Sequence, residues 1–185
     1  MFCVATEKYC AAIGGVFIII KLNLNNDETL KNVLELQETS YKIEAKIIDF
    51  YELPPLKDTV DSIRTCEENF YGYFIDGILA GIVSYKTIKN IIDIHRVAVH
   101  PCFFRRGISE KLLSFVEKLE TDINKVVVCT GKENIPAVCL YLKNGYKKTK
   151  DIEISNNIYI TKFEKILYVN YVTNECTILT KTLHS

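Results

Sequence analysis

The stretch that decides the fold is Val97–Ser109, which reads VAVHPCFFRRGIS. It ends a segment rich in β-branched residues, Ile91–Val99, which predicts a strand that stops at His100 and Pro101. The residues that follow, Gly107–Leu119, repeat their apolar side chains at helical spacing and predict an amphipathic helix. The sequence therefore predicts a strand, a basic loop and a helix in direct succession.

The start of this predicted helix offers a site for phosphate groups. The first N–H groups of a helix have no intrahelical partner, and the helix dipole is positive at that end. Gly107 lets a ligand approach the backbone closely, and Arg105 and Arg106 add positive charge. A surface helix that binds nothing can begin in the same way, so this segment alone leaves both interpretations open.

A second informative segment follows a short strand predicted over Lys125–Cys129. The next helix is predicted over Ile135–Lys143, and Asn134 opens it. Asn134 and Tyr141 lie seven residues apart, which places them two turns apart on one helix face. The amide suits an amide-bearing ligand, and the phenol can donate a proton to a leaving group. A helix cap and a packing aromatic ring are the alternative interpretation.

The rest of the chain supplies the other elements of a single domain. We predict these elements in order: a strand over Val16–Leu24, a helix containing Leu30–Leu36, a short helix within Lys57–Cys66, hairpin strands Phe70–Ile75 and Ile78–Tyr85 around Asp76 and Gly77, and two last strands, Tyr146–Ile154 and Ile158–Ile166. Residues Ile43–Leu53 fit either helix or loop. The order predicts a mixed α/β fold with a mostly antiparallel central sheet flanked by helices. We expect the domain to span residues 16–168, with a loose extension over 1–15 and a strand or tail over 169–185.

Composition narrows the classes of partner. The chain has 185 residues, with 23 Lys and Arg balanced by 23 Asp and Glu, which gives no general attraction to nucleic acid or to an anionic membrane. Its longest apolar run, Ala11–Ile20, is too short to cross a bilayer. The seven cysteines are scattered and form no Cys-x-x-Cys pair, so we expect no metal site, and we expect reduced thiols in a cytoplasmic protein.

Together the two segments resemble the GNAT superfamily, the acetyl-CoA-dependent N-acetyltransferases. The family's cofactor signature, Arg/Gln-x-x-Gly-x-Gly/Ala, falls on Phe104–Ser109, and its later signature falls on Asn134, Tyr141 and the pair Gly145–Tyr146. The resemblance covers about residues 70–163. Phe104 and Ser109 depart from the family pattern, but backbone N–H groups, which the resemblance implies hold the phosphates, survive both changes.

The resemblance implies direct transfer of an acetyl group from acetyl-CoA to an amine. It implies that the backbone N–H of Val97 polarises the thioester, and that Tyr141 protonates the departing thiolate. It also implies that the cofactor contacts the backbone of Val97 and Val99, the loop and helix start at Arg105, Arg106, Gly107, Ile108 and Ser109, and the side chains of Asn134 and Tyr141.

The base that deprotonates the amine stays open between Asp93 and His95. A two-residue period places both on one strand face with Val97 and Val99. Asp93 matches the family position of a proton-relaying residue, and His95 has the better intrinsic pKa. The alternatives are structural hydrogen bonds for both, or a nucleophilic Cys129 beside His95.

The acceptor is expected to be a primary amine of a small molecule or peptide. We expect it to contact a lid that carries Tyr41, Glu44, Tyr51 and Glu52, although these also fit ordinary solvated side chains. Alternatives are a non-catalytic acyl-CoA-binding module and a protein N-terminal acetyltransferase. The protein is expected to act as a monomer or homodimer.

Overall fold

The computed structural model describes residues 16–167. Its elements are, in chain order, β1 (Phe17–Lys21), α2 (Asp27–Ile48), the 3-10 helix η1 (Pro54–Lys57), α3 (Val60–Thr65), β2 (Asn69–Ile75), β3 (Ile78–Ile88), β4 (Ile91–Val99), the 3-10 helix η2 (Pro101–Phe103), α4 (Ile108–Leu119), β5 (Lys125–Gly131), α5 (Ile135–Lys143), β6 (Lys147–Ser155) and β7 (Ile158–Ile166). This order confirms the predicted one. The segments 1–15 and 169–185, expected as an extension and as a strand or tail, lie outside the described residues.

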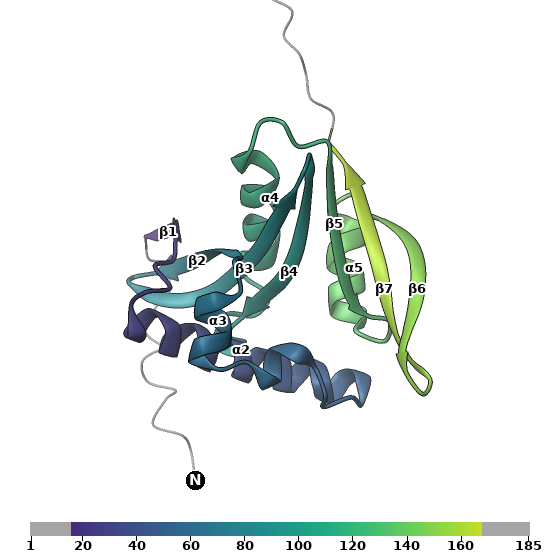
Figure 1. The fold of residues 1–185 in the computed structure, drawn as a ribbon, viewed down its shortest axis with the longest axis horizontal. Coiled ribbons are helices and arrows are strands. Elements are labelled where there is room, and N and C mark those ends of the chain that lie inside the picture. The colour runs from purple at the N-terminus through teal and green to yellow at the C-terminus, as the bar shows by residue number, and fades with distance from the viewer. Residues whose placement is uncertain (1–15, 168–185) are drawn as a thin grey trace, which may run out of the picture.

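The seven strands form one sheet in the order β1-β2-β3-β4-β5-β7-β6. Only β4 and β5 pair in parallel, and the other neighbours are antiparallel, which confirms the predicted mixed, mostly antiparallel sheet. One core cluster packs α2 and α3 against one face of the sheet, through Leu30, Val33 and Ile63. The other cluster packs α4 and α5 against the opposite face, through Leu112 and Tyr141 (Figure 1).

A bulge interrupts β4 near its middle. Ser84 of β3 pairs with Arg96, whereas the next residue, Tyr85, pairs with Ile94, so His95 is an extra residue on β4. Pairing between β4 and β5 ends at the same point, at Ile94 and Val128. Since a bulge bends its strand and strengthens the local twist, β4 turns away from β5 here. Figure 1 shows the two strands diverging toward one end of the sheet.

The bulge also corrects the prediction that one face of β4 carries both the candidate bases and the valines. Before the bulge, Ile92 and Ile94 point into the core beneath α4 and α5. After it, Val97 and Val99 point into that same core. The extra residue therefore shifts the alternation by one, and Asp93 lies on the opposite face, toward α2 and α3.

Helix α2 is long enough to cross the sheet. It begins at the cap residue Asn26, whose Oδ1 accepts a hydrogen bond from the Thr29 N–H at 2.9 Å. It ends at Asp49, which adopts a left-handed conformation with φ 51°. The ambiguous segment after Ile43 thus continues the helix to Ile48. With 22 residues, α2 is about 33 Å long at 1.5 Å per residue.

A glycine lets the end of α2 pack tightly on β5. A Cβ built at Gly131, the last residue of β5, would lie 2.9 Å from Cγ2 of Ile48, too close for any larger residue without movement. Helix α2 therefore reaches from the β1 side of the sheet to the end of β5, across the point at which β4 and β5 diverge (Figure 1).

Candidate active site

Side chains from α2 line the opening between the diverging strands. Tyr41 is buried, with 8% of its surface exposed, and its phenol oxygen faces the backbone N–H of Val97 on β4. Burial raises the pKa of Tyr41 well above its usual range, and the nearby Glu44 carboxylate raises it further. Tyr41 therefore stays protonated at any ordinary pH. It also touches the amide that the sequence predicts as the thioester donor.

Glu44 lies one turn further along α2 and meets the end of β5. Its Oε1 lies 3.5 Å from the Thr130 hydroxyl, and the Asn134 amide and the Gly131 N–H also donate toward it. Burial raises the pKa of this carboxyl despite these three donors. Within residues 16–167, no Lys, Arg or His forms an ion pair with it.

Tyr141 closes the opening from the α5 side. Its ring packs against Tyr146 and Phe163, with centroids 5.6 and 5.4 Å away. Burial raises its pKa, with smaller contributions from Glu44 and Cys129, so the phenol keeps its proton. No hydrogen bond of its hydroxyl is found in the described part of the chain. The ring thus packs as the alternative interpretation expects, while the hydroxyl is left available to a ligand.

Asn134 caps α5 and also faces the opening. Its Oδ1 accepts a hydrogen bond from the Ala137 N–H, and its Nδ2 donates to the Thr130 hydroxyl, both at 3.3 Å. The cap interpretation is therefore confirmed. The amide also donates toward the Glu44 carboxylate.

The basic loop before α4 exposes backbone N–H groups. Arg105 and Gly107 both adopt positive φ, at 63° and 72°, and Gly107 is the N-cap with no side chain to satisfy the helix. The first intrahelical donor is Lys111, so the amides of Ile108, Ser109 and Glu110 precede the helix ladder. The guanidinium of Arg106 stacks on the Phe103 ring at 5.1 Å. This geometry suits an anion at the helix start.

His100 belongs to the structure of this loop. Its Nδ1 accepts a hydrogen bond from the Cys102 N–H at 3.3 Å, and its ring meets Phe103 edge-on. Burial lowers the pKa of His100, so the ring is held neutral for this cap.

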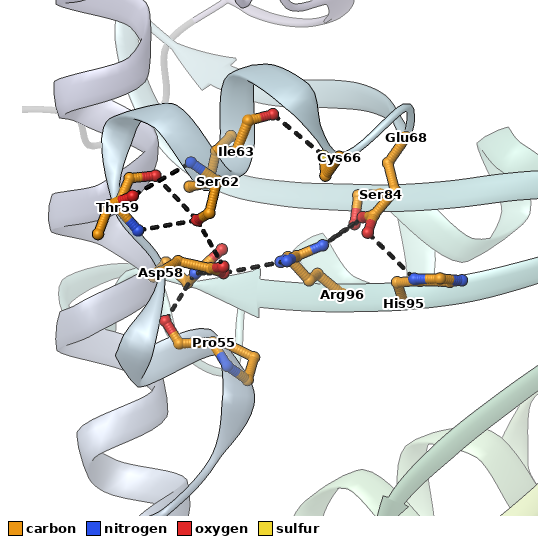
Figure 2. A network of polar contacts seen from close by, with 11 residues as sticks. Pro55, Asp58, Thr59, Ser62, Ile63, Cys66, Glu68, Ser84, His95 and Arg96 are labelled. Carbon is orange, nitrogen blue, oxygen red and sulfur yellow. Dashed lines mark hydrogen bonds and ion pairs between the residues drawn. The ribbon is translucent and has the colours of Figure 1, made fainter.

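The two predicted bases lie on the α2 and α3 side of the sheet, in a chain of polar contacts (Figure 2). His95 Nδ1 lies 3.1 Å from Oε1 of Glu68, and its Nε2 lies 3.7 Å from Oδ2 of Asp93. The hydrogen bonds to Asp93 and Glu68 raise the pKa of His95 to about 9. The imidazole is therefore already protonated at neutral pH, which disfavours it as the base.

Cys129 is poorly suited to act as a nucleophile. Burial raises the pKa of its thiol, and the nearby charge of Asp93 raises it further, so the reactive thiolate is disfavoured. The four described cysteines, Cys66, Cys102, Cys129 and Cys139, are all free thiols.

The four residues predicted in the lid separate into two pairs. Tyr41 and Glu44 lie on α2 at the opening, as described above. Tyr51 lies beyond the helix and is 61% exposed, and Glu52 forms an exposed ion pair with Lys57 at 2.5 Å. The solvated interpretation therefore holds for the second pair and not for the first.

Sequence reasoning missed a buried ionic network centred on Arg96. Its Nη2 donates to Asp58 at 3.0 Å, its Nη1 donates to Glu68, and Ser84 also donates to Glu68 (Figure 2). The available signal was the presence of three polar residues, Asp93, His95 and Arg96, in a strand whose other residues are apolar. The network ties β4, immediately after its bulge, to the loop before α3.

Residues 16–167 were also considered for a metal site and for a membrane-spanning helix. No group of three or more His, Cys, Asp or Glu side chains is arranged to hold a metal ion. No described helix is both long and apolar enough to cross a membrane.

Part of the chain matches a known protein family. Residues 66–148 match the family model described as the acetyltransferase (GNAT) domain. This part of the chain is a GNAT acetyltransferase domain. The match contains β4 with its bulge, the basic loop, α4 and Tyr141, and it assigns the domain to the acyltransferases.

The chain is similar in sequence to two proteins of different lengths and in fold to a solved structure. The chain is 35% identical over 133 residues to the UPF0157 protein YqkA of Bacillus subtilis, but it spans only 39% of that protein's length. It is 28% identical over 160 residues to a spermidine N(1)-acetyltransferase of Thermoplasma acidophilum, which covers 79% of the chain and 97% of the relative. A solved structure of the PaiA N-acetyltransferase from the same species, in complex with coenzyme A, has the same fold. It shares 22% identity and a TM-score of 0.64, over 80% of this chain and 98% of that one.

Proposed function

We propose that the chain transfers an acetyl group from acetyl-CoA directly to a primary amine of a small molecule or peptide. The observation that carries the proposal is the end of β4–β5 pairing at Ile94, beyond which the Tyr41 phenol contacts the Val97 N–H and lies near the Tyr141 phenol. The spermidine acetyltransferase relative supports an amine as the acceptor, and the coenzyme A complex of the PaiA neighbour supports the co-substrate.

In this proposal acetyl-CoA binds at two places. Its pyrophosphate contacts Arg105, Arg106 and the uncapped amides of Gly107, Ile108 and Ser109, where the helix dipole favours negative charge. Its pantetheine chain lies along the unpaired edge of β4 at Val97 and Val99, and the Asn134 amide bonds to it. The phenyl ring at Phe104, which is 42% exposed, contributes no charge to this site.

The proposed reaction needs one hydrogen-bond donor for the thioester carbonyl oxygen and one proton donor for the departing sulfur. The Val97 N–H, exchanging the Tyr41 phenol oxygen for the thioester oxygen, polarises the carbonyl, because it stabilises the negative charge that develops on oxygen during attack. Tyr141 gives its proton to the departing thiolate, and its raised pKa keeps that proton in place until then. Among the predicted bases, Asp93 is favoured over His95, because the imidazole is already protonated. We place the activity in the cytoplasm, which fits the free thiols.

Acetyl-CoA binding is the first test. The purified chain is heated with and without acetyl-CoA, and unfolding is followed by circular dichroism. A ligand at 100 times its Kd stabilises a protein by about 2.7 kcal/mol, so the melting temperature should rise measurably. No rise at millimolar acetyl-CoA would refute the proposal.

Transfer is the second test, with a thiol-reactive dye that reports free CoA in the presence of a panel of amines. Tyr141→Phe should lower kcat by roughly 100-fold, since a positioned acid contributes about that much, and should affect acetyl-CoA binding far less. Tyr51→Phe, on an exposed tyrosine, is the control and should behave as wild type. Thermal stabilisation without transfer to any amine would instead indicate a non-catalytic acyl-CoA-binding module.

A further inference from the structure

We propose that Glu44 binds the ammonium group of the acceptor and takes its proton before the amine attacks the thioester. The inference rests on the proposed function and assigns to it a residue that the two-residue period of β4 does not indicate. Its basis is the place of Glu44 at the opening and the lack of a cationic partner for it within residues 16–167.

The geometry places Glu44 between the two diverging strands. Three residues on one face of α2 contact the opening in turn. Tyr41 meets the Val97 amide on β4, Glu44 meets Thr130 near the end of β5, and Ile48 rests on Gly131. Helix α2 thus bridges the space that opens where β4 and β5 stop pairing, and Glu44 is the one carboxylate among these three contacts.

Charge is unbalanced around Glu44. In the described part of the chain, the groups that face it are neutral donors or phenols: Tyr41 from α2, Tyr141 from α5 and its cap residue Asn134, and Thr130 and Gly131 from β5. A carboxylate that is even partly buried without a counter-ion is unfavourable, because neutral donors only partly replace its hydration. Glu68, another carboxylate with little exposure, is paired with Arg96. A cationic ligand would supply at Glu44 the partner that this chain supplies at Glu68.

The other candidate base is placed less favourably. Asp93 is 41% exposed and lies beside the protonated His95, so its carboxylate already has a cationic partner and is hydrated. Its residue pairs with Val127, in the part of the sheet where β4 and β5 still touch. Glu44, in contrast, lies beside Tyr141, the proposed acid.

The proton balance of the step is complete without a further reactant. The acceptor R–NH₃⁺ gives one proton to the Glu44 carboxylate, and the free amine attacks the thioester carbon. The C–S bond breaks as the C–N bond forms, and the thiolate takes a proton from Tyr141. The new amide nitrogen loses its second proton, which restores the Tyr141 phenol. Glu44 returns its proton to water, so each turnover releases one proton.

This role predicts selectivity among amines. An alkylamine is an ammonium ion at neutral pH and needs both a counter-charge and a proton acceptor. An arylamine is neutral at the same pH and needs neither. Glu44→Gln keeps the shape of the side chain but removes its charge, so it should impair alkylamine acetylation far more than arylamine acetylation.

The experiment compares kcat/KM for an alkyl diamine and for an arylamine in wild type, Glu44→Gln and Glu38→Gln. Glu38 lies on the exposed face of α2, in an ion pair with Lys42, and serves as the matched control. We expect Glu44→Gln to lose roughly 100-fold with the diamine, the size of a general-base contribution, and less than about tenfold with the arylamine. Acetyl-CoA binding, measured by thermal shift, should be unchanged in both variants. Glu44→Asp, which keeps the charge but shortens the chain, should give an intermediate rate and shows that the position tolerates substitution.

The pH profile gives an independent readout. Because burial raises the pKa of Glu44, wild-type kcat/KM for the diamine should fall on the acid side at a pH above the usual range of a glutamate, and this limb should vanish in Glu44→Gln.

Three outcomes would overturn the inference. They are equal losses for both amines, a loss for Asp93→Asn with none for Glu44→Gln, or a changed acetyl-CoA affinity in Glu44→Gln, which would make the carboxylate part of the co-substrate site. Each of these is seen against an active wild type. An inactive wild type would refute the proposed function first.

Discussion

Replacing Arg96 with methionine should destabilise the fold strongly, because its charge is buried between two carboxylates. The Arg96 side chain is 11% exposed, and its partners Asp58 and Glu68 are 14% and 6% exposed. Removing one partner from a buried ion pair costs about 3–5 kcal/mol, since the other charge stays buried and unpaired. Arg96 Nη1 and Nη2 contact one carboxylate each, which favours the upper part of this range (Figure 2).

The pKa of Glu68 gives a second estimate of the same interaction. Burial acts to raise this pKa, but hydrogen bonds from His95, Arg96 and Ser84 outweigh burial and hold it at about 2, against an ordinary value of 4.5. That difference corresponds to about 3 kcal/mol, which three donors share. A group whose pKa is lowered by folding contributes stability above its ordinary pKa and loses it as the pH falls. The effect of Arg96→Met should therefore shrink as the pH falls from about 4.5 toward 2.

The assay is urea unfolding at pH 6, followed by circular dichroism, with Arg64→Met as the matched control. Arg64 also pairs with two carboxylates, Asp27 and Asp61, but these are 75% and 90% exposed, so its replacement should cost under about 1 kcal/mol. Equal effects of the two substitutions, or an effect of Arg96→Met that persists undiminished near pH 2, would refute the reasoning.

Three further predictions concern His95, the N-cap of α4 and the N-cap of α2. His95→Asn should flatten the dependence of stability on pH. Folding raises the pKa of His95 from 6.5 to about 9, so its contribution is full below pH 6.5 and disappears as the pH rises through 9. Melts at pH 6 and pH 10 should show a wild-type difference of only about 1 kcal/mol, because the side chain is 34% exposed and screened by solvent. Gly107→Ala should strain the left-handed N-cap by about 1 kcal/mol and weaken acetyl-CoA binding in calorimetry. Gly77→Ala, in the hairpin turn at φ 79°, should cost similar stability but leave binding unchanged. Asn26→Ala should cost about 1 kcal/mol in urea unfolding through loss of the α2 cap, and an unchanged midpoint would contradict this.

Local signals predicted most of the elements. Asp76 and Gly77 both adopt positive φ, as a two-residue hairpin turn requires, so the predicted hairpin was correct. Strand β4 and helix α5 begin and end at the predicted residues, because Pro101 ends the first and Asn134 caps the second. These features depend on neighbours in the sequence, and the sequence alone therefore suffices for them.

Features that depend on distant neighbours were not predicted. No residue in β4 marks His95 as the extra residue, because the bulge exists only in the register with β3. The two-residue alternation was therefore wrong between Asp93 and Val97, which is where the sequence prediction used it to choose a base. Glu44 carried a weak signal, a carboxylate three residues after Tyr41 beside an apolar stripe. Its position at the opening depends on the length of α2 and on Gly131, which together determine where the helix meets β5.

The stoichiometry of transfer in one reaction tests directly whether the chain is an N-acetyltransferase. Mass spectrometry of the amine and a thiol assay of the CoA follow a mixture of the purified chain, acetyl-CoA and an alkyl diamine. Direct transfer predicts one acetylated amine for each thiol released, and no acetylated form of the protein when the amine is omitted. Thiol release without acetylated amine, or acetyl groups that accumulate on the protein alone, would contradict the proposed N-acetyltransferase.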